Sequence, residues 1–383
     1  MDTLNKKIKI LICFGTRPEG IKLAPIIKLL EKQKDKFEFV ICSSGQHSQM
    51  LNQVLDFFEI VPDIDLKLMA ENQSLDALSA RILSKMGSVL DKVKPDILLI
   101  QGDTTTAFLT ALSAFYKKIR VGHVEAGLRT FDKFNPFPEE INRQLITKVT
   151  DFHFAPTEIS RKNLLRENIP EEKIFLTGNT IVDAILWALD KINRKVCVIE
   201  AREPFKNIPG GHKIILVTMH RRETFGKELL DVCNALKIIS KRHSNIQFVY
   251  PVHLNPNVRI PVFELLGNVK NILLTEPLDY ESFIWLMNKS YFIISDSGGI
   301  QEEAPTLNKP VLVIRKKTER MESVDLGISK IIGTYKDNII KETLDLIEHE
   351  ENYNNMINKG NPYGDGKAAD KIITIIEKKL DLE

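Results

Sequence analysis

Short runs of β-branched and other apolar residues alternate with longer stretches of helical periodicity along most of the sequence. This alternation is typical of parallel sheets, because parallel strands need crossover connections that are usually helical. Strands are predicted at residues 8–14, 37–42, 96–100, 119–124, 151–154 and 174–176, and in a second series at 214–217, 246–250, 272–274, 292–294 and 311–314. We therefore predict an α/β fold of two doubly wound, Rossmann-like domains facing a cleft. The length of 383 residues, at ~150 residues per domain, also favours two domains.

Helical segments are predicted between these strands. The clearest has six apolar residues at spacings of three and four, which would share one buried face: Leu75, Leu78, Ile82, Met86, Val89 and Val93. Further helices are predicted from the residue after Asn179 to about Lys191, and from Lys367 to Leu380. The segment 204–212, PFKNIPGGH, is rich in proline and glycine and is predicted to be a linker or boundary.

Composition excludes several classes of protein. With 53 Lys and Arg against 51 Asp and Glu, the net charge of +2 argues against a protein that coats nucleic acid or an anionic membrane. No apolar run approaches the roughly 18–20 residues that span a bilayer, and the lysines and apolar residues near the N-terminus run into Gly15 without a signal-peptide cleavage site. Four widely spaced cysteines suit reduced core positions in a cytoplasmic protein and lack metal-ligand spacing: Cys13, Cys42, Cys197 and Cys233.

Ligands of doubly wound sheets bind beyond the carboxyl ends of the strands, so candidate functional residues are expected there. The first predicted strand is followed by GTRPEGIK, residues 15–22. A glycine turn that opens a helix offers free backbone N–H groups, and Arg17 and Lys22 add positive charge. This loop suits a phosphorylated ligand, although an ordinary strand-to-helix turn is about equally plausible for it alone.

Carboxylates follow the next strands. Asp103, taken alone, is better interpreted as the N-cap of the following helix. Glu125 lies between His123 and Arg129 in a glycine-bearing loop, a setting that favours function over ordinary surface polarity. Glu139 stands with Glu140 at a predicted helix start, where glutamates commonly complement the helix dipole.

The second half carries groups suited to anions at its strand ends. His220 is followed by two arginines, and the turn at residues 297–299, Ser-Gly-Gly, can offer backbone donors to a phosphate. Glu303 is placed to accept from sugar hydroxyls, Arg320 adds a cation, and His253 is equally compatible with a structural hydrogen bond. Neither a Walker A motif nor a G-x-G-x-x-G fingerprint is present, so a nucleotide-sugar is favoured over ATP or NAD, and no cofactor is expected.

These motifs together resemble the non-hydrolysing UDP-N-acetylglucosamine 2-epimerases of bacteria. The resemblance covers nearly the whole chain, through GTRPEGIK, GDTTT, GHVEAGLRT, PFPEEINRQ, HFAPTE, TGNTIVDA, HRRETFG, YPVHLNPNVR, EPLDY, SDSGGIQEEAP, KPVLVIR, TER and NPYGDGKA. It implies the two-domain glycosyltransferase-B fold, with an N-terminal domain of residues 1–178, a UDP-binding domain of residues 179–366, and a C-terminal helix, 367–383, that packs back on the first domain. It also implies a homodimer and a supply of UDP-ManNAc for cell-surface polysaccharides.

The resemblance also implies roles for individual residues. The catalytic positions would be Asp103, Glu125, Glu139 and His220. UDP would be bound by Arg17, Lys22, His220, Phe283, Ser297, Gly298, Gly299, Glu303 and Arg320. A second, activating UDP-GlcNAc would be bound by Gln46, Gln49, Glu139, Arg221 and His253.

The chemistry favours one mechanism and leaves four alternatives open. No carbonyl acidifies the C2–H bond of an N-acetylhexosamine, so loss of UDP from C1 and removal of the C2 proton, giving 2-acetamidoglucal, is the economical route. Readdition of UDP with protonation from the other face yields the epimer, which requires two acid–base groups. The alternatives are a hydrolysing epimerase or one acting on a related UDP-sugar such as a uronate, a glycosyltransferase of the same fold, and a non-catalytic UDP-sugar sensor.

Overall fold

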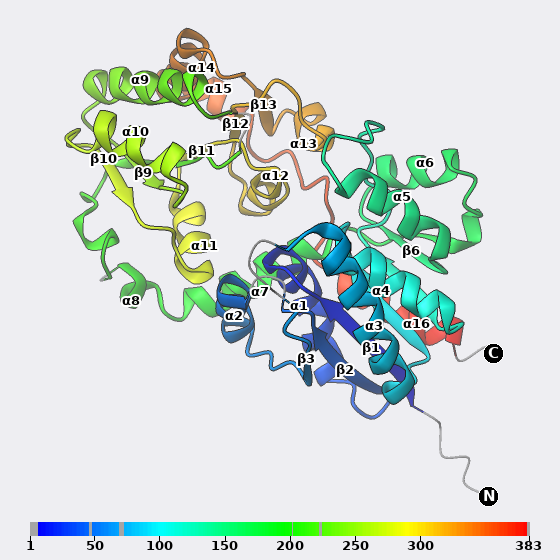
Figure 1. Ribbon diagram of the computed structural model, residues 1–383. Coiled ribbons are helices and arrows are strands. Elements are labelled where there is room, and N and C mark those ends of the chain that lie inside the picture. The colour runs from blue at the N-terminus through cyan, green and yellow to red at the C-terminus, as the bar shows by residue number, and fades with distance from the viewer. Residues whose placement is uncertain (1–6, 46–47, 69–72, 201, 222–223, 381–383) are drawn as a thin grey trace, which may run out of the picture. The chain divides into compact units, whose positions relative to one another are not determined.

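The computed structural model describes residues 7–45, 48–68, 73–200, 202–221 and 224–380, without the side chains of residues 48–50. The chain divides into two compact units, residues 1–184 with 363–383 and residues 185–362. Each unit contains one wholly parallel sheet, and several of the strands are labelled in Figure 1. The predicted class, two doubly wound α/β domains, is confirmed.

The first unit has a seven-stranded sheet in the order β3-β2-β1-β4-β5-β6-β7. Its strands are β1 (Ile8–Phe14), β2 (Phe37–Ser43), β3 (Ile64–Asp65), β4 (Ile97–Gln101), β5 (Arg120–Val124), β6 (Phe152–Ala155) and β7 (Ile174–Leu176). Its helices are α1 (Arg17–Glu31), α2 (Ser48–Phe58), α3 (Leu75–Val93), α4 (Thr105–Tyr116), α5 (Glu139–Val149), α6 (Glu158–Arg166), the 3₁₀ turn η1 (Glu171–Lys173) and α16 (Ala368–Leu380). Helix α16 packs against α1, and Lys36 forms an ion pair of 2.6 Å with Glu377.

The second unit has a six-stranded sheet in the order β10-β9-β8-β11-β12-β13. Its strands are β8 (Lys213–Thr218), β9 (Ile246–Pro251), β10 (Ile272–Thr275), β11 (Phe292–Ser295), β12 (Val311–Val313) and β13 (Ser329–Ile331). Its helices are α8 (Val196–Glu200), α9 (Lys227–Arg242), α10 (Pro256–Leu266), α11 (Tyr280–Lys289), α12 (Gly298–Glu303), α13 (Met321–Asp325), α14 (Lys336–Glu348) and α15 (Glu350–Asn354), with 3₁₀ turns η2 (Phe205–Asn207) and η4 (Ala304–Leu307). Helix α7 (Thr180–Asn193) carries the chain from the first unit into the second.

The strand order determines where ligands can approach each sheet. In the first unit the order reverses between β1 and β4, and in the second it reverses between β8 and β11. The loops that leave two such strands diverge to opposite faces of the sheet and open a crevice at their carboxyl ends. The GTRPEGIK and GDTTT loops leave the first pair, and the HRRETFG and SDSGGIQEE loops leave the second.

Apolar composition explains the central strands. β1 (IKILICF) and β4 (ILLIQ) are almost wholly buried, as expected for strands that helices cover on both faces. In α3 the predicted apolar face is buried except for Leu75, which is 44% exposed because it begins the helix. Leu90 of the same helix is also buried, although it was not predicted to be.

Two further expectations need correction. Cys197 is exposed, whereas the other three cysteines are buried and all four are free thiols. The segment 204–212 lies inside the second unit, where Phe205 is buried and its ring centroid lies 4.5 Å from that of Trp285. Among the helices of the described residues, none combines the length and apolar character needed to cross a bilayer.

Candidate active site

The loop after β1 is built around a buried carboxylate. Glu19 accepts hydrogen bonds from the backbone N–H groups of Gly15, at 2.9 Å, and Thr16, at 2.7 Å, so that Thr16 caps α1. The Thr104 hydroxyl, in the loop after β4, donates to the other oxygen of Glu19 at 2.6 Å. Burial raises the pKa of Glu19, while these hydrogen bonds act to lower it. Glu19 therefore fixes two loops of the crevice relative to each other, a role that the sequence alone did not reveal.

Asp103 is not the N-cap of α4. Thr104 is the cap, since its hydroxyl accepts from the backbone N–H of Ala107, and the cap interpretation of Asp103 was wrong. The carboxylate of Asp103 instead forms an ion pair of 2.8 Å with Arg143 of α5, and the Asn142 amide donates to the Asp103 carbonyl. Arg143 was not singled out in the sequence, although it lies four residues after Glu139 on one helical face.

Glu139 begins α5 close to the same arginine. Burial raises the pKa of Glu139, the negative charge of Asp103 raises it further, and Arg143 acts in the opposite direction. Glu140, by contrast, is fully buried and accepts from the backbone N–H groups of Thr130, at 2.9 Å, and Phe131, at 3.2 Å. It therefore supports the preceding loop, whereas Asp103 and Glu139 form a carboxylate pair beside Arg143.

Glu125 follows β5 and stands beside Lys22. The backbone of Glu125 is in the left-handed region, with φ of 67°, and its carboxylate forms an ion pair with the Lys22 ammonium of α1. The Asn179 amide also donates to Glu125, at 3.3 Å. Because β1 and β5 both neighbour β4, the topology brings Lys22, Asp103 and Glu125 to one end of the sheet.

His123 and Arg129, which flank Glu125 in the sequence, are structural. His123 is buried within β5 and its Nε2 pairs with the Gly102 carbonyl at 2.7 Å, which supports the loop of Asp103. Arg129 is buried and pairs with Glu167 through Nε at 2.6 Å. Arg17 occupies the first position of α1 and is half-buried.

In the second unit, Asp296 organises the loop after β8. Its buried carboxylate accepts from the backbone N–H groups of His220 and Arg221, each at 3.0 Å, and from the Thr224 hydroxyl, at 3.0 Å. The Nδ1 atom of His220 lies 3.2 Å from the other oxygen of Asp296. Burial would raise the pKa of Asp296, but the contacts with His220 lower it below its ordinary value. The adjacency of β8 and β11 creates this contact, so only the topology reveals Asp296.

His253 lies beside His220. The two ring centroids are 6.3 Å apart and the rings are nearly parallel, at 29°. Burial lowers the pKa of His253, and the neighbouring His220 lowers it further. Of the other residues predicted for a second UDP-GlcNAc, Gln46 lies outside the described residues, and Gln49 belongs to α2 without a described side chain.

Arg320 belongs to a cluster of charges around the Ser-Gly-Gly turn. Its guanidinium pairs with Glu302 at 2.8 Å and with Glu319 at 2.7 Å. Burial would raise the pKa of Glu319, but Arg320, Arg315 and Arg221 together hold it at about 2. A side chain on Gly298 would lie 3.2 Å from the Glu319 carboxylate, so this glycine gives the turn a close approach to the cluster. Of the other predicted UDP-binding residues in this unit, Phe283 is half-buried on α11, Gly299 is exposed, and Ser297 and Glu303 are half-buried at the two ends of α12.

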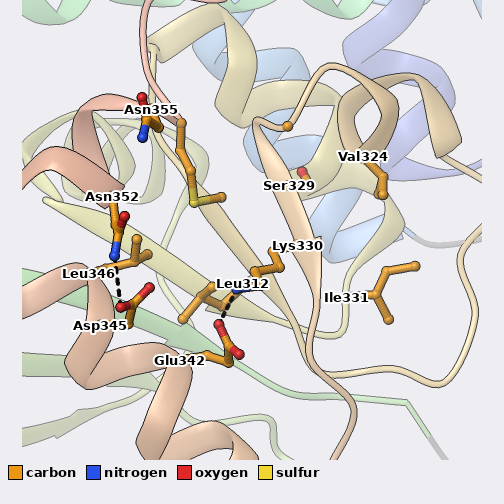
Figure 2. Close-up of a pocket in the computed structure, with 12 residues that line it drawn as sticks. Leu312, Val324, Ser329, Lys330, Ile331, Glu342, Asp345, Leu346, Asn352 and Asn355 are labelled. Carbon is orange, nitrogen blue, oxygen red and sulfur yellow. Dashed lines mark hydrogen bonds and ion pairs between the residues drawn. The ribbon is translucent and has the colours of Figure 1, made fainter. Parts of the chain in front are cut away.

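A separate cavity of about 480 Å³ lies in the second unit between β13, α13, α14 and α15 (Figure 2). Figure 2 shows two pairs among its polar groups, Lys330 with Glu342 and Asn352 with Asp345. None of the site residues predicted from the sequence lines it, so the candidate site is assigned to the strand ends. Within the part of the chain that is described, no group of three or more His, Cys, Asp or Glu side chains forms a metal-binding cluster.

Known proteins are similar to this chain over nearly its full length. Residues 29–377 match the family model described as UDP-N-acetylglucosamine 2-epimerase. The UDP-N-acetylglucosamine 2-epimerase of Campylobacter jejuni is 53% identical to this chain, and the match covers 97% of this chain and 97% of that protein. The UDP-N-acetylglucosamine 2-epimerase of Escherichia coli K12 is 49% identical, and the match covers 97% of this chain and 98% of that protein.

Solved structures agree with the sequence comparisons. The UDP-GlcNAc 2-epimerase of Neisseria meningitidis, solved bound to UDP-GlcNAc, is 47% identical with a TM-score of 0.91, over 97% of this chain and all of that one. The enzyme of Methanocaldococcus jannaschii, solved in complex with UDP-GlcNAc and UDP, is 34% identical with a TM-score of 0.79, over 97% of this chain and all of that one. On this evidence the chain belongs to the UDP-N-acetylglucosamine 2-epimerase family.

Proposed function

We propose that the chain interconverts UDP-GlcNAc and UDP-ManNAc without net hydrolysis, by elimination of UDP and its readdition. The observation that carries this proposal is the set of three carboxylates at one end of the first sheet, with Asp103 and Glu139 beside Arg143 and Glu125 beside Lys22. A protein that only bound a UDP-sugar would not need acid–base groups at these positions. C2 inversion needs such groups on both faces of the sugar ring.

The proposed reaction conserves every atom of the substrate. The C1–O bond breaks with its electron pair going to UDP, and the developing positive charge at C1 acidifies the C2–H bond. A carboxylate accepts the C2 proton and 2-acetamidoglucal forms. Protonation of C2 from the opposite face and return of the UDP oxygen to C1 give the epimer.

The electrostatic settings favour different roles for the carboxylates. Burial and the charge of Asp103 raise the pKa of Glu139, so its protonated form is more populated at neutral pH than that of a solvated carboxyl group. We assign Glu139 to protonation of the glycal carbon for this reason. Asp103 forms an ion pair with Arg143, and Glu125 forms one with Lys22. We assign removal of the C2 proton to these two carboxylates.

The second unit supplies groups suited to a diphosphate that leaves and returns. His220 is oriented by Asp296, and Arg320 stands beside the Ser-Gly-Gly turn. Preorganised donors of this kind stabilise charge as it develops on a leaving group. We assign UDP binding to His220, Phe283, Ser297, Gly298, Gly299, Glu303 and Arg320, together with Arg17 and Lys22 of the first unit. We also propose that His253 and Arg221 take part in activation by a second UDP-GlcNAc, because His253 lies beside His220.

Proton NMR of UDP-GlcNAc incubated with the protein tests the proposed function. The expected result is a stable mixture of two UDP-sugars in the absence of any acceptor or added cofactor. Accumulation of free ManNAc and UDP would instead identify a hydrolysing enzyme, and the absence of turnover would leave a glycosyltransferase or a sensor. The same assay on a panel of UDP-sugars, including a uronate, measures sugar specificity.

A further inference from the structure

The chain leaves the first unit and returns to it through two segments that touch. The outgoing segment contains Gly178 and Asn179, and the returning segment begins at Tyr363. The backbone N–H of Asn179 donates to the Tyr363 carbonyl at 2.7 Å. A side chain on Gly364, which has φ of 130°, would lie 3.2 Å from the Gly178 Cα atom. These contacts join the two connecting segments backbone to backbone.

The side chain of Asn179 uses both of its polar atoms at this junction. Its Oδ1 accepts from the backbone N–H of Ile181 at 3.0 Å, which fixes the start of α7. Its Nδ2 donates to Oε2 of Glu125 at 3.3 Å. Asn179 is only 3% exposed, so its orientation is set by its surroundings. An amide can accept from the backbone through its oxygen and donate to a carboxylate through its nitrogen at the same time.

Glu125 needs such a support. Its backbone is in the left-handed conformation, and its carboxylate pairs with the Lys22 ammonium of α1. A lysine ammonium acts as a point charge on a flexible stem and does not fix the plane of a carboxylate. The Oδ1 atom of the buried Asn179 is already bound to the backbone of Ile181, so the amide cannot rotate freely and its Nδ2 atom gives Glu125 a directional contact.

We propose that Asn179 is a positioning residue for the epimerisation, which orients the Glu125 carboxylate and connects it to both segments that join the two units. This inference rests on the proposed function, since it assigns the proton-transfer role to Glu125. It predicts that removing the amide donor slows the chemical step while leaving substrate binding and the start of α7 intact.

The variant Asn179→Asp separates the two roles. Aspartate retains an oxygen that caps α7 as well as asparagine does, but it replaces the donor to Glu125 with a carboxylate. We expect kcat to fall about 10- to 100-fold, as for loss of a hydrogen bond to a charged group, with KM within about threefold. Repulsion between the two carboxylates should lower the thermal midpoint, but circular dichroism should show a folded variant at the assay temperature. Asn179→Ala should lose both activity and thermal stability.

A matched control is Asn207→Asp in the second unit. The Asn207 amide also donates to a glutamate, Glu203, at 2.8 Å, but this pair is exposed. The control should retain wild-type kcat. Equal kcat in Asn179→Asp and the wild type, or a fall in kcat that appears only at temperatures where the variant unfolds, would overturn the proposal.

A carboxyl ¹³C NMR titration of Glu125 gives a readout that does not depend on turnover. The Glu125 carboxylate faces the Lys22 ammonium of α1, and the substitution leaves both of these residues unchanged. The second carboxylate that the substitution introduces should therefore raise the pKa of Glu125 above its wild-type value. An unchanged pKa would refute the contact. If the wild type fails to interconvert the two UDP-sugars, the proposed function fails, and this titration still decides whether Asn179 acts on Glu125.

Discussion

At the scale of single residues, the site depends on partners that stand far away in the sequence. Arg143 pairs with Asp103 from 40 positions away, and Asp296 organises His220 across the sheet from β11. The family motifs contained each of these partners. Residue type and spacing did not indicate which charged side chains form ion pairs, because strand order decides which loops lie side by side. The sequence therefore predicted the candidate carboxylates but not the side chains that hold them.

The three carboxylates give the first prediction. Asp103→Asn, Glu125→Gln and Glu139→Gln should each lower kcat by about 100-fold or more, because each removes a proton acceptor or donor without changing its shape. Steady-state kinetics with UDP-GlcNAc measure the change. Glu158→Gln, at an exposed glutamate of α6, is the matched control and should retain wild-type kcat. Near-normal turnover in all three variants would refute the assignment.

At the scale of secondary-structure elements, most strands and helices could be predicted because the apolar runs of a sheet covered on both faces are nearly continuous. The predicted strand bounds agree with the structure within about one residue at most ends. Two strands were missed, β3 and β13, which have two and three residues and lie at sheet edges. Such short edge strands bury too little surface to leave an apolar pattern. The cap of α4 was assigned one residue too early, because Asp103 and Thr104 are both good cap residues.

Strands β5 and β6 carry a pair of buried histidines that should make stability depend on pH. His123 and His153 are register partners, and burial lowers their pKa values to about 4 and about 3. Above about pH 6.5 both are neutral whether the chain is folded or unfolded. As pH falls below 6.5, the unfolded chain binds protons that the folded chain does not. The free energy of unfolding therefore decreases until the pH reaches the pKa values of the two histidines in the folded chain.

Urea unfolding at pH 7.0 and pH 5.5 measures this effect. The free energy of unfolding should fall between these values, with a limiting slope of about 1.4 kcal/mol per pH unit for each histidine. His153→Gln should show a shallower dependence, whereas His349→Gln, at an exposed histidine, should match the wild type. A free energy that is the same at both pH values would contradict the burial of neutral histidines.

At the scale of the whole molecule, the proposed roles are divided between two units with the same doubly wound plan. The strand order reverses between β1 and β4 in the first sheet and between β8 and β11 in the second, and loops of the candidate site leave these strands. The near-zero net charge of the chain hides this division. Arginines gather beside the Ser-Gly-Gly turn of the second unit, and paired carboxylates gather at the strand ends of the first.

This division predicts different effects on UDP binding. Arg320→Gln should weaken UDP binding about tenfold or more, because it removes a charge-assisted contact at the turn. Asp103→Asn should bind UDP within about threefold of the wild type. Isothermal titration with UDP measures both, with circular dichroism as the check on folding. Equal losses of affinity in the two variants would contradict the division of roles.

A homodimer remains a prediction at this scale, and light scattering of the purified protein tests it. The measured mass should be twice that of one chain. A mass equal to one chain across a range of concentrations would refute the dimer without affecting the proposed chemistry, since the assigned groups all belong to a single chain.

The central claim is that the protein removes and returns a proton at C2 while the sugar remains, overall, a UDP-sugar. Incubation of UDP-GlcNAc and, separately, of UDP-ManNAc in D₂O, followed by proton NMR, tests it most directly. The account predicts that both reactions reach the same mixture of the two UDP-sugars and that the product carries deuterium at C2. Products that keep protium at C2, or free N-acetylmannosamine that accumulates with UDP, would contradict it.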